Sequence, residues 1–156
     1  MSDDESLITP AMEAAIGTEG EARNVTVDKE LVLRLMHALD EEDPDLLAAV
    51  ESGDTSYPIP TYALLTTSTS QRQLEVPDAP ERALMAADAW EVKADIHLGD
   101  KLTIVPRLAE IQERIGGRVG HSLFIHHEWV YTNQDEVEVA RVRRTVTHFQ
   151  TRHTGE

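Results

Sequence analysis

The sequence predicts an α+β fold, in which a few helices precede an antiparallel sheet that packs on one buried helix. Three observations indicate this order. Apolar residues recur at helical spacing between residues 29 and 39. From Leu84 onward, apolar and polar residues alternate with a period of two, which is typical of strands. Turn-forming segments such as Gly99-Asp100 separate the alternating runs. Runs of helix followed by runs of antiparallel strand therefore predict α+β.

Two helices are predicted before residue 40. A short helix covers residues 11–16, with Thr9-Pro10 suited to its N-cap and first turn. A longer helix covers residues 29–39, because its apolar residues form one face. Either Thr26 or Asp28 can cap this helix with a side-chain oxygen.

Two more helices are predicted between residues 40 and 75. The acidic run 40–43 and Pro44 end the preceding helix, since the residue before a proline avoids the helical region. Asp45 then caps a short helix that runs through Val50. Residues 62–74 are apolar enough to form a buried helix, although the threonines of this segment would also suit a strand.

Long antiparallel strands are predicted in the second half of the chain. Residues 90–98 alternate, and after the Gly99-Asp100 turn, of the hairpin kind, a strand continues over residues 102–111. A Gly-rich turn precedes the strand over residues 121–131, and the last strand covers residues 137–149. The far face and the edges of such a sheet need cover, which a second copy of the fold or a related chain would supply.

The composition indicates a single domain over residues 8–150, with flexible ends at residues 1–7 and 151–156. The chain has 156 residues, of which 40% are hydrophobic, and a chain of this length can bury one core. The absence of cysteine excludes a disulfide framework, a cysteine nucleophile and a thiolate metal site. No apolar run is long enough to span a bilayer, and the acidic N-terminus lacks the pattern of a signal peptide. We therefore expect a cytoplasmic protein.

Negative charge is concentrated in the first 60 residues. The net charge is −15, and residues 1–60 hold 15 acidic and three basic residues. Such a surface repels phosphate backbones and anionic membranes, so we expect neither nucleic acid nor a membrane as a partner. The acidity serves solubility or faces a basic partner. The main positive charge available to a coenzyme A or phosphopantetheine ligand lies in the C-terminal half, at Arg107, Arg114, Arg118, Arg141, Arg143 and Arg144.

Several short segments occur in an order that resembles a known family. They are Ile8-Thr9-Pro10 followed by Ile16-Gly17, residues 38–44, residues 57–61, residues 98–102 and residues 131–135. Together they are similar to the MaoC-like hotdog dehydratases, in the branch that resembles the N-terminal dehydratase region of type I fatty acid synthase. The similarity covers roughly residues 8–150. It implies a hotdog fold, an antiparallel sheet wrapped around a central helix, that pairs with a second hotdog.

The resemblance also implies an activity on acyl thioesters of coenzyme A or acyl carrier protein. Water would be added or removed across the 2,3 bond with R stereochemistry. That reaction needs an acid/base pair and donors to the thioester carbonyl. Catalytic members of the family carry D-x-N-P-x-H. With Pro44 as the anchor, the Asp position is Glu41, the Asn position is Asp43 and the His position is Leu46.

Leu46 is the decisive departure from the family pattern, because a leucine cannot transfer a proton. Glu41 and Asp43 form a degenerate acid position, for which the plain alternative is a helix end in water. His37 and His97 are expected to face solvent or a packing surface, and His121, which begins a strand next to the Gly-rich turn, is the better candidate for a substitute. His126-His127 would point to opposite faces of a strand, so they cannot converge on a metal. We expect neither a metal nor a cofactor.

Pro60, Thr61 and Tyr62 are the candidate substrate-binding residues. The resemblance places them where the central helix starts, and the free N–H groups there could polarise a thioester carbonyl. The alternative is that Pro58 and Pro60 only stiffen the entry to the helix while Tyr62 packs.

The leading hypothesis is a non-catalytic, pocket-shaping subunit of a heteromeric (R)-specific enoyl-thioester hydratase or 3-hydroxyacyl-thioester dehydratase. A second hotdog chain with the Asp/His pair would complete a heterodimer or heterotetramer. Two alternatives stay open. One is a self-sufficient homodimeric enoyl-CoA hydratase that uses Glu41 or a displaced histidine. The other is a hotdog that binds acyl-CoA without catalysis. The acyl group, either a long fatty chain or a steroid-like side chain, is left open.

Overall fold

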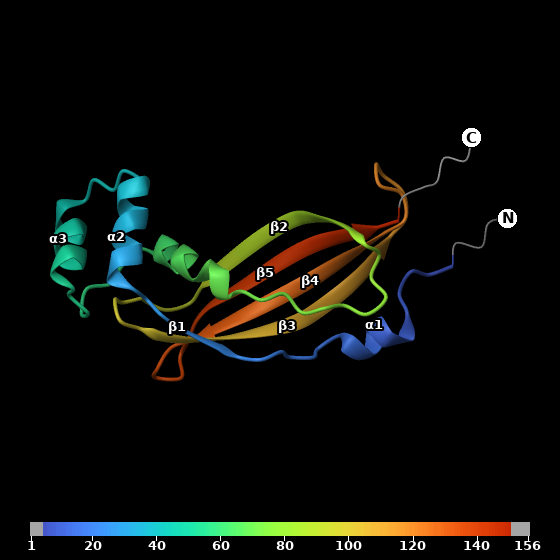
Figure 1. The fold of residues 1–156 in the computed structure, drawn as a ribbon, viewed down its shortest axis with the longest axis horizontal. Helices are drawn as coiled ribbons and strands as arrows, with labels where there is room; N and C mark the ends of the chain where they lie inside the picture. The colour runs from blue at the N-terminus through green and yellow to red at the C-terminus, as the bar shows by residue number, and fades with distance from the viewer. Residues whose placement is uncertain (1–4, 151–156) are drawn as a thin grey trace.

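The computed structural model describes residues 5–150 and shows a curled antiparallel sheet with helices gathered mainly at one end (Figure 1). The sheet has five strands in the order β1-β3-β4-β5-β2. This arrangement confirms the predicted α+β class and the hotdog architecture. Flexible ends were expected at residues 1–7 and 151–156, of which residues 1–4 and 151–156 lie outside the described residues. Ser6 and the backbone N–H of Leu7 both hydrogen-bond Glu113.

Three α-helices form before residue 53, close to the predicted positions. They are α1 (Pro10–Ala15), α2 (Lys29–Ala38) and α3 (Pro44–Ser52). Thr9 caps α1 and Asp28 caps α2, in each case by accepting a hydrogen bond from the backbone of the first turn. The predicted cap of α3 was wrong by two residues. Asp43, rather than Asp45, accepts from the backbone N–H groups at the start of α3.

The buried helix predicted over residues 62–74 is instead the 3₁₀ helix η1 (Thr61–Ser70). The threonines explain its tight winding, because Thr66 and Thr67 donate their hydroxyls to the carbonyl oxygens three residues earlier. After η1, residues 71–80 run without regular structure to the start of β2, and we call this segment the strap. The sheet therefore curls around a short helix and an extended strap rather than around one long helix (Figure 1).

The strands are β1 (Arg23–Thr26), β2 (Arg82–Val92), β3 (Lys101–Arg114), β4 (Ser122–Thr132) and β5 (Glu138–Phe149). The predicted hairpin at Gly99-Asp100 was wrong as a strand pairing. β2 pairs with β5 at the opposite edge of the sheet, while β3 pairs with β1 and β4. The alternating pattern that suggested a strand through Leu98 leaves the sheet after Val92, and only Ile96 forms an isolated bridge, to Ile59.

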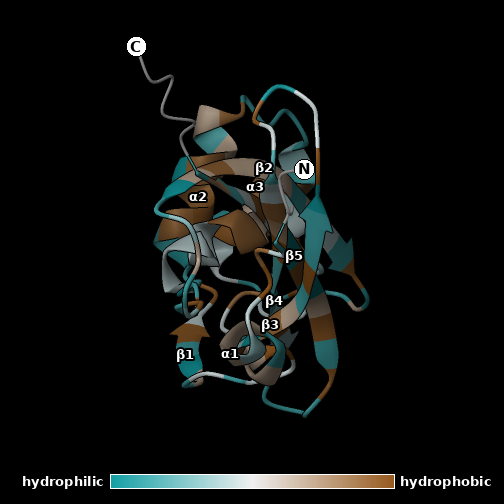
Figure 2. Ribbon diagram, turned by 90° about the vertical axis from the view of Figure 1, so that its right-hand side faces the viewer, coloured by the Kyte–Doolittle hydropathy of each residue, from teal (hydrophilic) through white to brown (hydrophobic). Residues whose placement is uncertain are grey.

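The central strands β3, β4 and β5 alternate between buried apolar residues on the inner side of the sheet and more polar, partly exposed residues on the outer side. On β4 the inner face carries Leu123, Ile125, His127, Trp129 and Tyr131, all of which are buried. The hydropathy of the strands alternates accordingly (Figure 2). Two apolar clusters fill the inner side. The larger joins α2, α3 and η1 to the sheet, and the smaller joins α1 and the strap to β3 and β4.

Candidate functional site

The structure brings two of the predicted site segments together through Glu41 and Tyr62. Glu41 lies in the loop between α2 and α3, and Tyr62 lies in the first turn of η1. The phenol of Tyr62 donates to Oε2 of Glu41 at 2.6 Å, while the backbone N–H of Asp43 donates to Oε1 at 3.1 Å. Both oxygens of the carboxylate are therefore engaged within this chain.

The two hydrogen bonds fix the protonation of both side chains at neutral pH. Donation by Tyr62, and then by the backbone of Asp43, lowers the pKa of Glu41 below its ordinary value. Burial and the adjacent Glu41 carboxylate raise the pKa of Tyr62 far above its ordinary value. Glu41 thus stays a carboxylate and Tyr62 stays a phenol. A lower pKa makes the Glu41 carboxylate a weaker general base and keeps it unprotonated at neutral pH.

The positions that correspond to the Asn and His of the family motif have structural roles. Asp43 accepts hydrogen bonds from the backbone N–H groups of Asp45 and Leu46, at 3.0 and 3.2 Å, and so caps α3. The side chain of Leu46 is 6% exposed and belongs to the larger apolar cluster. An imidazole at position 46 would therefore lie in the core, and not at the mouth of a site.

An open hollow of about 390 Å³ lies beside Glu41, lined by His37, Asp40, Glu41 and Glu42. His37 stands at the end of α2, one helical turn before Glu41, and is exposed. The sequence left open whether His37 faces solvent or packs, and the structure shows it exposed. The sequence did not predict that its imidazole shares a hollow with the Glu41 carboxylate. Because the carbonyl of His37 accepts the N–H of Asp40, the turn after α2 sets their relative positions.

A second hollow, of about 310 Å³, lies where η1 begins. It is lined by Thr61 and by neighbours that include Lys93 and Asp95. No side chain caps the start of η1, where Pro60 occupies the N-cap. The substrate-binding residues proposed from the sequence thus divide between two places, since Thr61 lines this hollow and Tyr62 turns toward Glu41.

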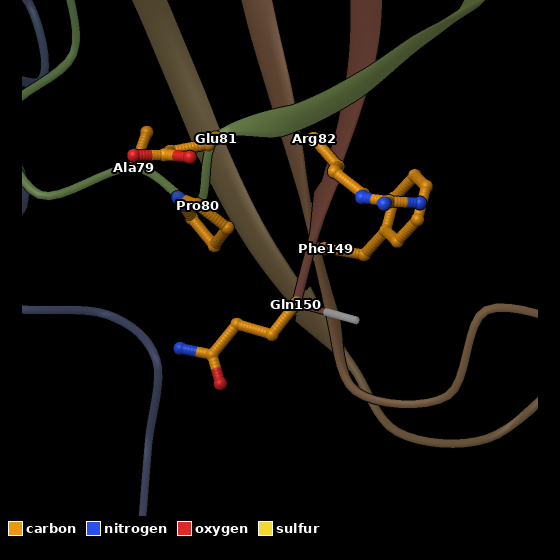
Figure 3. Close-up of a pocket in the computed structure, with 6 residues that line it drawn as sticks. All are labelled: Ala79, Pro80, Glu81, Arg82, Phe149 and Gln150. Atoms are coloured by element: carbon orange, nitrogen blue, oxygen red, sulfur yellow. The ribbon is translucent and has the colours of Figure 1, made fainter. Parts of the chain in front are cut away.

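A third hollow lies at the start of β2 and the end of β5, far from α2 and α3 (Figures 1 and 3). It measures about 450 Å³ and is lined by residues 79–82 together with Phe149 and Gln150. Figure 3 shows the guanidinium of Arg82 next to the ring of Phe149, with Glu81 directed to the other side. Among the described residues that line it, Glu81 is the one carboxylate and none is a histidine, so they offer no pair of groups for proton transfer.

The remaining histidines lie away from Glu41. His121, the better candidate from the sequence, bonds Glu113 at 2.6 Å near the β3–β4 turn, at the opposite end from α2 and α3 (Figure 1). His126 bonds Thr145 on the outer face, whereas His127 stacks on Trp129 inside, so they do point to opposite faces. Within residues 5–150, no three His, Asp or Glu side chains are grouped to hold a metal ion.

Most of the arginines expected to serve a coenzyme A ligand are engaged within the sheet. Arg107 pairs with Glu128, Arg141 with Glu138, Arg143 with Glu110 and Arg144 with Asp88. Arg114 lies over the ring of Phe124, 4.2 Å from its centroid. On the described strands, these arginines are therefore not free to bind the phosphates of a ligand in the first two hollows.

Comparison with solved structures supports the fold. The ChsH1-ChsH2 complex from Mycobacterium tuberculosis gives a TM-score of 0.68 at 15% identity, over 93% of this chain and 89% of that one. The HadBC (3R-hydroxyacyl-ACP dehydratase) complex from the same organism gives 0.61 at 13%, over 85% and 96%. A MaoC-like dehydratase from Rhodospirillum rubrum gives 0.60 at 13%, over 88% and 94%. No curated protein matches.

A family model defines the membership of the chain. The model of the FAS1-like dehydratase domain region matches residues 14–142, which is most of the chain and includes Glu41, Asp43, Leu46 and the segment from Pro60 to Tyr62. Within the described part of the chain, no helix is both long and apolar enough to cross a membrane. The chain belongs to the FAS1-like dehydratase region family and shares the hotdog fold of the MaoC-like dehydratases.

Proposed function

We propose that this chain is the non-catalytic, pocket-shaping subunit of a heteromeric (R)-specific enoyl-thioester hydratase or 3-hydroxyacyl-thioester dehydratase. The observation that carries the proposal is the state of the motif positions. Leu46 is buried in the core, Asp43 caps α3, and both oxygens of Glu41 accept hydrogen bonds from within the chain. None of these three side chains is arranged to take up and return a proton.

The chemistry would be completed by a second hotdog chain that carries an aspartate and a histidine. In the hydration direction, the hydroxyl of a water molecule bonds to C3 of the enoyl thioester and a proton is added at C2. The partner's acid/base pair would take the proton from water and deliver one to C2. The role of this chain is to form one wall of the site at Thr61 and Tyr62.

Two features support a partner. Similar structures include the ChsH1-ChsH2 and HadBC complexes, each named for two components. On this chain, β2 is an edge strand whose residues 82–89 are all exposed, including Leu84 at 58% and Met85 at 67%. An edge strand with exposed apolar side chains is a template for pairing with another chain. We therefore propose that the partner chain pairs along β2.

The same proposal predicts which chain contacts the carrier of the acyl group, whether this is coenzyme A or acyl carrier protein. Four arginines of this sheet are already paired with acidic side chains, so they are not free to bind phosphates. The phosphates of the carrier would then contact the partner, while this chain contacts the acyl part.

Reconstitution with its partner tests the proposal. The chain should be co-expressed with the product of the neighbouring gene. The mass of the complex should be measured by native mass spectrometry, and its activity should be assayed with enoyl-CoA substrates. Replacing the partner's aspartate or histidine should abolish hydration. Glu41→Gln in this chain should keep the activity of the complex within about threefold. Loss of activity in Glu41→Gln with the complex intact would contradict the assignment.

A second candidate function is favoured by one observation, the hollow shared by His37 and Glu41. In a self-sufficient homodimer, His37 would replace the missing histidine and Glu41 would orient the water. This arrangement predicts that His37→Gln and Glu41→Gln each abolish turnover by the isolated chain. The engagement of Glu41 by Tyr62 and by the backbone of Asp43 favours the first proposal.

A further inference from the structure

A connected set of polar side chains joins the edge strand β2 to the strap. Arg144 of β5 donates Nε and Nη2 to the two carboxylate oxygens of Asp88 on β2, both at 2.9 Å. Nη2 also donates to the amide oxygen of Gln71, at 3.2 Å. The amide nitrogen of Gln71 donates to the phenol of Tyr131 at 2.8 Å. The bidentate geometry fixes the guanidinium, which in turn holds the first residue of the strap.

Trp129 holds the next residue of the strap. Its indole N–H donates to the carbonyl oxygen of Arg72 at 3.0 Å, and its ring lies beneath Arg144, 5.0 Å from the guanidinium carbon. Trp129 is 1% exposed. A strap that lifted away would expose this indole and break its hydrogen bond, so the N–H of Trp129 reports the position of the strap.

A buried histidine lies beside Trp129. His127 stacks on Trp129, with 6.3 Å between ring centroids, and is 1% exposed. Neither of its ring nitrogens has a hydrogen-bond partner within the described residues. Burial of this unpaired ring costs free energy, whereas the bonds from Arg144 and Trp129 hold the start of the strap against the sheet. The strap has no regular structure of its own, and it is held by these bonds at its start and by the packing of Leu74, Val76 and Ala79 in the smaller apolar cluster.

We propose that the Asp88–Arg144–Gln71 connection is a tether through which a strand paired along β2 tightens the strap over the inner face of the sheet. The inference rests on the proposed function in one respect, the pairing of a second hotdog chain with β2. In the free chain, the side chains of Asp88 and Arg144 are 30% and 22% exposed. A strand laid beside β2 would remove water from this ion pair, and charge pairs attract more strongly where water is excluded.

The tether itself is tested on the free chain. Exchange of the Trp129 indole proton should be measured by NMR in the wild type and in Asp88→Asn, with the indole of Trp90 as an internal reference. We expect Asp88→Asn to accelerate Trp129 exchange about tenfold. Glu110→Gln is the matched control, because it removes an Arg143 ion pair from the outer face of the same sheet. Equal exchange in Asp88→Asn and wild type, or equal acceleration in both variants, would overturn the tether.

The action of the partner is tested on the complex. Trp129 exchange should be slower in the complex than in the free chain, and Asp88→Asn should remove this slowing while the complex still forms. A complex that forms and slows exchange equally in both proteins would refute the control by β2. If no second hotdog chain binds, the proposed function fails, while the measurement on the free chain still decides whether the tether exists.

Discussion

At the scale of single residues, the main departure from the family motif is Leu46, at the position of the motif's histidine. Leu46 is packed among the apolar residues of α2, α3 and η1, and Glu41 is held by Tyr62 and by the backbone of Asp43. The sequence predicted the loss of the histidine directly, because the acidic run and Pro44 fix the alignment. It could not predict the partner of Glu41, since a hydrogen bond between residues 21 positions apart depends on the tertiary fold.

Restoring the motif should not restore activity. Leu46→His would place an imidazole in an apolar cluster without a partner, so we expect the free energy of unfolding to fall by about 2–4 kcal/mol. Urea unfolding measures this change, with Ala48→His on the exposed side of α3 as the control. Hydration of enoyl-CoA by a folded Leu46→His protein would show that position 46 opens onto a site.

His127 should make stability depend on pH. Burial, followed by the nearby charges of His148 and Arg144, lowers the pKa of His127 from 6.5 to about 4. The unfolded chain therefore takes up a proton first as the pH falls. Folding stability is complete above pH 6.5 and is lost progressively toward pH 4, by up to about 3 kcal/mol.

His127→Phe removes this contribution. The free energy of unfolding of His127→Phe should vary less between pH 6.5 and 4 than that of the wild type, in urea titrations at several pH values. His37→Gln, at an exposed position, should keep the full dependence. A His127→Phe protein with the same pH dependence as the wild type would place the proton uptake elsewhere.

At the scale of elements, the sequence predicted the helices, which depend on local signals. It did not predict which strands pair, because pairing joins residues that are far apart in the sequence. Side-chain caps and prolines located α1, α2 and α3 within a few residues. The Gly99-Asp100 turn looked like a hairpin because a local pattern cannot show whether two consecutive strands pair with each other or with other strands of the sheet. The helix after Pro60 became 3₁₀ because its threonines bond their own backbone.

Asp100 holds the start of β3 against the β4–β5 turn. It is 6% exposed and accepts hydrogen bonds from the backbone of His97 and the amide of Gln134, at 2.9 and 3.0 Å. Asp100→Ala leaves these donors unpaired, so the free energy of unfolding should fall by about 1–3 kcal/mol. Asp135→Ala, in the β4–β5 turn next to Gln134, should change the free energy of unfolding little. Thermal unfolding of both variants separates the two results, and equal stability would contradict this role.

At the scale of the whole molecule, the sheet has one long edge strand, β2, whose side chains are largely exposed. The inner face is covered by η1 and the strap near β3 and β4, while β2 stays exposed. The sequence predicted that the edges of an antiparallel sheet would need to be covered. It could not identify β2 as the exposed edge strand, because the order of the strands was unknown.

Assembly should depend on the exposed side chains of β2. Leu84→Lys should weaken the complex at least tenfold and leave the fold of the free chain intact, since Leu84 already faces solvent there. Ile115→Lys, at an equally exposed position in the β3–β4 turn, should not affect the complex. Native mass spectrometry of the co-expressed chains measures both, and an undiminished complex in Leu84→Lys would place the partner elsewhere.

The central claim is that the proton-transferring groups come from another chain. Its most direct measurement is the rate at which the purified chain alone hydrates crotonyl-CoA and longer enoyl-CoA substrates. We expect the purified chain to show no turnover above that of buffer. Turnover of about 1–10³ per second, within the ordinary range of enzymes and lost in Glu41→Gln, would contradict it.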